Sequence, residues 1–105
     1  MTANDLNARL RRMPEAERER ILLDVVMECT ATVLGYHEPD ALEPDMDFPE
    51  AGVDSLTAVE IRSRIAARIG VPVPRARFRA RTTFAESAKI LAALVAEAEG
   101  APVRP

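Results

Sequence analysis

Apolar positions in the first third of the chain recur with helical spacing. A single stripe at three- and four-residue intervals is formed by Leu22, Val25, Val26, Cys29 and Val33. Pro14 suits the first turn of this helix, and Gly35 suits its C-terminal end. Upstream, Leu6, Leu10 and Met13 also have helical spacing, so we expect a short extra turn or two there.

A second helix is predicted from Ser55 to Ile69, ended by Gly70 and the following Pro72. Its core stripe comprises Ala58, Ile61, Ile65 and Ile69. Leu56 and Val59 lie well outside that stripe, which indicates an exposed surface for a partner. The alternative interpretation is a wider core face that also buries these two side chains.

A third long helix is expected to begin at Thr83, because Glu86 lies three residues later and completes a capping box. Its buried face contains Phe84, Leu91, Val95 and Ala98, with Leu94 at the edge. Gly100 is expected to end it.

Two irregular segments separate these helices. Residues 36–53 read as a long, acidic, proline-rich loop, held in place by Leu42, Met46 and Phe48 and turning at Gly52. Residues 71–82 contain two prolines and predict a loop with one short helical turn, anchored by Phe78.

The predicted fold is therefore all-α: a small four-helix bundle with three main helices, one short helix and a long loop between the first two main helices. No internal repeat or strand alternation appears. We assign residues 14–99 to one domain, residues 1–13 to a leader or linker with room for a short helix, and residues 100–105 to a C-terminal tail.

Composition indicates a soluble cytoplasmic protein, expected to be a monomer. The single cysteine, Cys29, cannot form an internal disulfide and falls on the buried stripe, where we expect an inert core thiol. No apolar run approaches the roughly 20 residues that cross a bilayer.

Charge is unevenly distributed: residues 1–54 carry 5 basic and 13 acidic side chains, and residues 55–105 carry 9 and 4. Four basic side chains gather at Arg75, Arg77, Arg79 and Arg81. They are a candidate docking patch for an acidic partner, with a solvated loop as the plainer alternative. A nucleic-acid-binding domain is disfavoured, because the pI is near 5.2 and no aromatic side chains interleave the arginines.

No catalytic or metal-binding constellation is evident. His37 has no neighbouring histidine or cysteine with zinc-ligand spacing, and the acidic loop lacks the spacing of a calcium-binding hand. A triad of Ser55, His37 and an acid would lack an oxyanion hole, and so small a domain leaves little room for a substrate cavity. We therefore expect a non-catalytic protein without a metal.

The stretch GVDSLTAVEI, residues 52–61, places three capping side chains at one helix start. Asp54, Ser55 and Thr57 compete for the cap, and Glu60 is spaced for a capping box with Thr57. If Asp54 or Thr57 is the cap, the Ser55 hydroxyl is surplus at the positive end of a helix, where an attached phosphate is stabilised. The alternative is that Ser55 is simply the cap.

The longer stretch GVDSLTAVEIRSRI resembles the attachment motif of acyl carrier protein domains from modular type I polyketide synthases, where Gly-x-Asp-Ser-Leu-Thr-Ala-Val-Glu-Leu is typical. The resemblance covers about residues 9–98, through LRRMPEAERERILLDVV, PDMDFPEAGVDSL and TTFAESAKILAALV. The sequence departs from the family pattern at Ala51, Ser87, Arg77 and Arg79. Peptidyl carrier domains of nonribosomal peptide synthetases are the nearest alternative, but they more often show Gly-Gly-(His/Asp)-Ser.

The resemblance implies a carrier-protein bundle in which Ser55 receives 4′-phosphopantetheine from coenzyme A through a separate phosphopantetheinyl transferase. The arm would hold polyketide intermediates as thioesters and deliver them to ketosynthase, acyltransferase and other synthase domains. Asp54 would support the attachment motif, and Leu56 and Val59 would belong to the partner surface.

Overall fold

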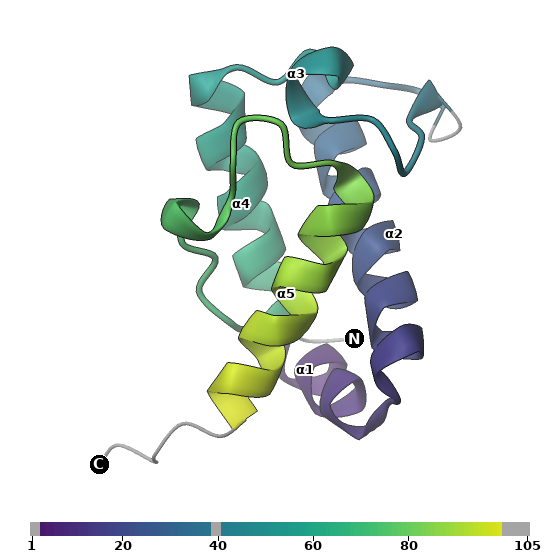
Figure 1. The fold of residues 1–105 in the computed structure, drawn as a ribbon, viewed down its shortest axis with the longest axis vertical. Helices are drawn as coiled ribbons and strands as arrows, with labels where there is room; N and C mark the ends of the chain where they lie inside the picture. The colour runs from purple at the N-terminus through teal and green to yellow at the C-terminus, as the bar shows by residue number, and fades with distance from the viewer. Residues whose placement is uncertain (1–2, 39–40, 100–105) are drawn as a thin grey trace.

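Helices form the regular structure of the chain. The computed structural model describes residues 3–38 and 41–99. Its elements are α1 (Ala3–Arg12), α2 (Glu15–Leu34), α3 (Phe48–Ala51), α4 (Ser55–Ile69), the 3₁₀ turn η2 (Arg75–Arg77) and α5 (Phe84–Glu99) (Figure 1). The all-α prediction is confirmed, with α2, α4 and α5 as the three main helices and no β-strand within the described ranges.

Helix α2 is the centre of the packing, because it contacts both α4 and α5. Leu22, Val25, Val26 and Cys29 of its predicted stripe are buried, and Val33 packs partly buried against the same core. Gly35 ends the helix at φ 79°, a left-handed conformation that glycine adopts without strain, and its N–H donates to the Ala31 carbonyl. Burial raises the pKa of the Cys29 thiol, which agrees with an inert core cysteine.

Helix α1 is longer than the predicted turn or two and belongs to the same core. Leu6 and Leu10 are buried, and α1 contacts both α4 and α5 (Figure 1). The buried Asn7 side chain donates a 2.8 Å hydrogen bond to the carbonyl of Ile69 at the end of α4. At the end of α1, the Arg18 guanidinium of α2 donates to the Leu10 carbonyl at 2.7 Å. Residues of the predicted leader thus cover the lower end of the bundle in Figure 1.

The acidic loop contains a helical turn that the sequence interpretation missed. Asp47 caps α3 through a capping box: its Oδ1 accepts from the Glu50 N–H at 2.8 Å, while Glu50 Oε1 accepts from the Asp47 N–H at 3.0 Å. The predicted anchors hold, since Leu42 is buried and Met46 and Phe48 pack partly buried against the core. The described residues 41–53 of this segment therefore include a capped helical turn rather than a plain loop.

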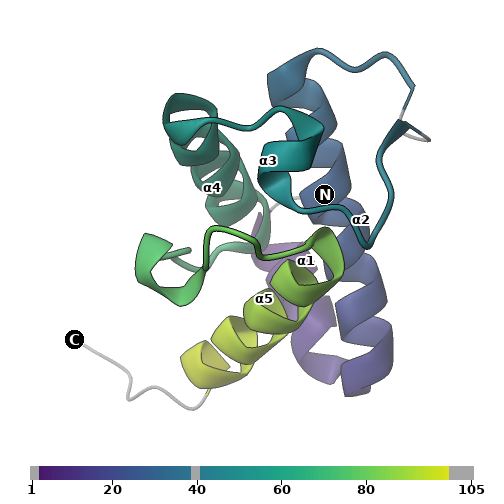
Figure 2. The same cartoon turned by 45° about the horizontal axis from the view of Figure 1, so that its top comes forward.

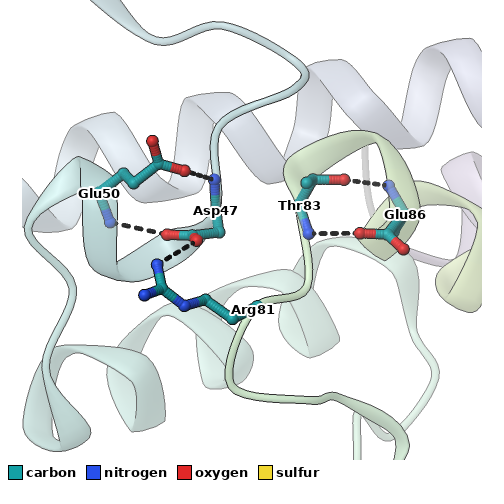
Figure 3. A network of polar contacts seen from close by, with 5 residues as sticks. All are labelled: Asp47, Glu50, Arg81, Thr83 and Glu86. Atoms are coloured by element: carbon teal, nitrogen blue, oxygen red, sulfur yellow. Dashed lines mark hydrogen bonds and ion pairs between the residues drawn. The ribbon is translucent and has the colours of Figure 1, made fainter.

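A polar network joins the start of α3 to the start of α5 (Figure 3). The predicted Thr83–Glu86 capping box is confirmed, with backbone-to-side-chain hydrogen bonds of 3.0 and 3.1 Å. Arg81 Nη1 donates to Asp47 Oδ2 at 3.0 Å, and Asp47 and Thr83 form an isolated β-bridge. These contacts hold the two helix starts side by side, and Phe48 and Phe84, the first residues of α3 and α5, form an edge-to-face pair.

The remaining predictions for the last third of the chain agree with the structure. The 3₁₀ turn η2 is the expected short helical turn, and Phe78 packs partly buried against the core. Phe84, Leu91 and Val95 are fully buried, Leu94 is also buried, and Ala98 is partly buried. Gly100 and the predicted tail at 100–105 lie outside the described residues.

Acid should weaken this network. Backbone hydrogen bonds lower the pKa of Asp47 and of Glu86 below their ordinary values of about 4, and Arg81 lowers the pKa of Asp47 further. A pKa lowered by folding contributes stability above the unfolded-state value, and this stability is lost as pH falls through the folded-state value. We therefore expect the urea midpoint to fall below about pH 4. Asp47→Asn keeps a capping oxygen but removes a titrating group, so the urea midpoint of this variant should fall less steeply with falling pH than that of the wild type. An equal pH dependence in the two proteins would show that Asp47 does not cause the loss of stability in acid.

Candidate functional site

The hydrogen bonds in the first turn of α4 show which side chain is its N-cap. Asp54 is the N-cap: its Oδ1 accepts from the Thr57 N–H at 2.9 Å, and Thr57 Oγ1 accepts from the Asp54 N–H at 2.9 Å. The capping box thus joins Asp54 and Thr57, and the expected box between Thr57 and Glu60 is wrong. Glu60 instead pairs with Arg64 at 3.5 Å on the outer face of the helix.

Ser55 is left with a free hydroxyl. It is the first residue of α4, its side chain is exposed, and its Oγ makes no hydrogen bond to any described residue. Because Asp54 already serves as the cap, the hydroxyl has no structural task in the first turn. It stands at the positive end of a 15-residue helix, where an anion is stabilised by the helix dipole.

The apolar pair beside Ser55 faces solvent. Leu56 is 80% exposed and Val59 is 53% exposed, whereas Ile61, Ile65 and Ile69 are buried. These values exclude the wider core face that the sequence left open. The prediction that Ala58 belongs to the core stripe holds only in part, since this residue is half-buried.

A pocket of about 630 Å³ opens next to Ser55, contrary to the expectation that so small a domain has little room for a cavity. It is bounded by α3, by α4 and by the segment that carries η2 and leads into α5; Figures 1 and 2 show this segment running alongside α4. Ile61, Ile65 and Leu91 contribute apolar surface to the pocket. Sequence analysis missed it because its walls come from segments that are far apart in the sequence, including Val26 of α2 and Ser87 and Leu91 of α5.

The four arginines of the predicted docking patch divide into two pairs. Arg77 forms an ion pair with Glu97 of α5, with Nη1 lying 3.1 Å from Oε2, and Arg81 pairs with Asp47 at 3.0 Å. Arg75 and Arg79 instead line the pocket beside Ser55, together with Arg62 of α4. All four are exposed, but they do not make one uniform patch.

Other candidate chemistry finds no support. His37 is exposed in the connection after α2, and no hydrogen bond joins it to Ser55. Across residues 3–38 and 41–99, no group of three or more metal-ligating side chains comes together. No helix in these ranges combines the length and apolar character needed to cross a membrane.

Comparisons with known proteins agree with this geometry. Residues 24–91 match the family described as "Phosphopantetheine attachment site". The chain is 49% identical over 63 residues to mycoketide-CoA synthase of Mycobacterium tuberculosis, a match that covers 60% of the chain and 2% of that protein.

Two further relatives are polyketide synthases of Streptomyces. The chain is 46% identical over 70 residues to the spectinabilin polyketide synthase system protein NorA of Streptomyces orinoci, covering 67% of the chain and 4% of NorA. It is 40% identical over 91 residues to the pikromycin polyketide synthase component PikAIII of Streptomyces venezuelae, covering 86% of the chain and 6% of PikAIII. The chain thus spans only a few per cent of the length of these relatives.

Proposed function

Because the chain belongs to the phosphopantetheine attachment family, whose members carry this group covalently, we propose that Ser55 is the residue that bears its 4′-phosphopantetheine. The observation that supports this assignment best is the exposed Ser55 hydroxyl, which lacks a hydrogen bond at the start of α4. A phosphodiester on this oxygen would lie at the positive end of the helix.

The neighbouring residues fit such a group. Asp54 supports attachment indirectly, since its capping box with Thr57 holds the first turn and leaves the Ser55 side chain unengaged. Leu56 and Val59 provide exposed apolar surface within one turn of Ser55, suited to contact with a transferase or a synthase domain. When bound, the arm supplies a terminal thiol that holds an acyl group as a thioester.

We propose further that the chain is a non-catalytic acyl carrier in polyketide assembly. The support comes from the relatives that are named as polyketide synthases and from the motif at residues 52–61. Its partners would be a phosphopantetheinyl transferase and the ketosynthase, acyltransferase and other domains of a synthase, in the cytoplasm, with the carrier itself monomeric. A peptidyl carrier domain is the second candidate, and the same relatives favour the polyketide assignment over it.

The main argument for a nucleic-acid-binding domain, the cluster of four arginines, is weakened because two of them form ion pairs. Arg77 and Arg81 are each paired with a carboxylate of the chain itself, so the basic cluster cannot present four free cations to a phosphate backbone.

The proposal is tested by incubating the protein with coenzyme A and a broad-specificity phosphopantetheinyl transferase, followed by intact-mass measurement. We expect one phosphopantetheine per chain and none when the transferase is omitted. A protein that stays unmodified, although a known carrier in the same tube is converted, would contradict the proposed function.

Truncating Leu56 should separate partner recognition from stability. Leu56 is 80% exposed, so Leu56→Ala is expected to change the free energy of unfolding by less than about 0.5 kcal/mol. The same change at the fully buried Leu22 should cost about 2–5 kcal/mol. If Leu56 contacts the transferase, Leu56→Ala should also slow modification by this enzyme several-fold. Modification at the wild-type rate would show that Leu56 is not part of the contact surface.

A further inference from the structure

Helix α3 and the residues beside it are attached to the bundle mainly by polar contacts. The principal helix packing joins α1, α2, α4 and α5, and α3 has no comparable contact with another helix of the described ranges. Within residues 44–53, here called the α3 segment, only Asp47 and Ala51 are buried. A segment that buries few apolar side chains opens at a lower free energy than the core of the same protein.

Two backbone carbonyl groups of the α3 segment cap the start of α5. The first N–H groups of a helix have no partner within the helix itself. In α5, the Phe84 N–H donates to the Met46 carbonyl at 3.0 Å, and the Ala85 N–H donates to the Pro44 carbonyl at 2.9 Å. These two amide protons therefore report directly on whether the α3 segment is attached to α5.

One ion pair strengthens this attachment through side chains (Figure 3). Arg81 Nη1 donates to Asp47 Oδ2 at 3.0 Å, and the Asp47 side chain is only 7% exposed. The other carboxylate oxygen of Asp47 already accepts from the Glu50 N–H. Without Arg81, Oδ2 would lose its partner among the described residues, and a buried carboxylate oxygen without a partner destabilises the attached state.

The same ion pair connects two segments that line the pocket beside Ser55. Residues 48–49, which directly follow Asp47, contribute to the lining, and so do residues 78–80, which directly precede Arg81. Detachment of the α3 segment from the start of α5 would therefore separate two walls of the pocket and widen it.

We propose that the α3 segment acts as a lid of this pocket, that it detaches from α5 while the other helices stay packed, and that Arg81 holds it closed. Gly52, at φ 102°, lies between α3 and α4 and can absorb the rotation of the lid. The proposal concerns access to the pocket and does not depend on the attachment of a group at Ser55.

Amide hydrogen exchange at low urea concentrations measures the opening. We expect the Phe84 and Ala85 amide protons to exchange with one shared free energy, lower than that of the buried α2 residues Val25 and Val26, and with a smaller dependence on urea. Arg81→Ala should accelerate both protons by the same factor, at least about fivefold, because a buried carboxylate loses its partner. If Phe84 and Ala85 exchange only as slowly as Val25 and Val26, the α3 segment opens only by global unfolding and the proposal is wrong.

Two further variants assign the effect to the ion pair. Arg81→Lys keeps a cation beside Asp47 and should restore most of the slow exchange. Arg77→Ala removes the ion pair with Glu97 of α5, which does not involve the α3 segment, so the same two amide protons should exchange at the wild-type rate. Equal acceleration by Arg77→Ala and Arg81→Ala would contradict a specific role of the contact with Asp47.

Access to the pocket is measured with a thiol at position 87. Ser87 lines the pocket and is 1% exposed, whereas Cys29 of α2 is 4% exposed and does not line it. In Ser87→Cys, iodoacetamide should alkylate position 87 at least about tenfold faster than Cys29, with each rate taken relative to the same thiol in urea-unfolded protein. Addition of Arg81→Ala should raise the rate at position 87 about fivefold or more.

The two measurements test the two parts of the proposal. Alkylation of position 87 as slow as that of Cys29 would show that the pocket opens only by global unfolding, and would overturn the proposal. A rate at position 87 that does not respond to Arg81→Ala, although the Phe84 and Ala85 amide protons exchange faster, would show that the α3 segment opens without controlling the pocket.

Discussion

Ser55→Ala is expected to abolish modification by phosphopantetheine completely while leaving the protein folded. The hydroxyl is the only group removed, and it makes no hydrogen bond to the described residues. Asp54 and Thr57 still close the capping box of α4, so the free energy of unfolding should change by less than about 1 kcal/mol. Intact mass after incubation with transferase and coenzyme A measures the first effect, and urea unfolding measures the second.

Two matched variants control this result. Ser63→Ala removes another exposed serine of α4 and should leave modification unchanged. Thr57→Ala removes one half of the capping box and should lower stability while Ser55 is still modified. Phosphopantetheine on the Ser55→Ala protein would place the attachment at another residue.

Leu10→Ala should produce a large loss of stability, about 2–5 kcal/mol. Leu10 is fully buried in the core that α1 shares with α4 and α5, so its truncation should leave a cavity in that core. The midpoint of urea unfolding and its slope measure the loss. The expectation is informative because the sequence placed residues 1–13 in a leader.

Arg11→Ala is the control for this prediction, since the Arg11 side chain is exposed on the same helix. It should change the free energy of unfolding by less than about 0.5 kcal/mol. A Leu10→Ala protein as stable as this control would show that α1 adds nothing to the core and that the domain begins after it.

The long helices could be predicted because their signals are local. A stripe such as the one through Leu22 and Val26 repeats over several turns, and Gly35 and Gly70 end their helices in the left-handed conformation. The start of α5 was found for the same reason, since Thr83 and Glu86 are only three residues apart. The same helical periodicity placed Leu56 outside the core stripe, but it left open a wider core face that would bury this side chain.

The short elements depend on contacts between distant residues. A four-residue helix such as α3 is not stable by itself, and here Arg81, 34 residues away, supports its capping residue Asp47. In α1, the Asn7 side chain donates a hydrogen bond to the carbonyl of Ile69, 62 residues farther along the chain. A local sequence pattern could not predict that Arg81 contacts Asp47 or that Asn7 contacts Ile69.

The candidate site also combines features that local sequence signals predict with features that depend on contacts between distant residues. The three neighbouring capping side chains left two interpretations, a surplus Ser55 hydroxyl or Ser55 as the cap itself, and the structure identifies Asp54 as the cap. The pocket could not be inferred, because its lining combines α3, α4 and the segment with η2 with residues of α2 and α5. Which arginines face it depended on the positions of Glu97 and Asp47 in space, and these pair with Arg77 and Arg81.

The central claim, that Ser55 bears the phosphopantetheine, is tested most directly by locating the added mass within the chain. Cleavage after arginine yields the peptide of residues 21–62 from the loaded protein, in which Ser55 and Thr57 are the hydroxyl residues of the α4 start. Fragmentation of this peptide should place the entire phosphopantetheine mass on Ser55, with Thr57 unmodified. An added mass on Thr57, or on a peptide that does not contain Ser55, would contradict the assignment.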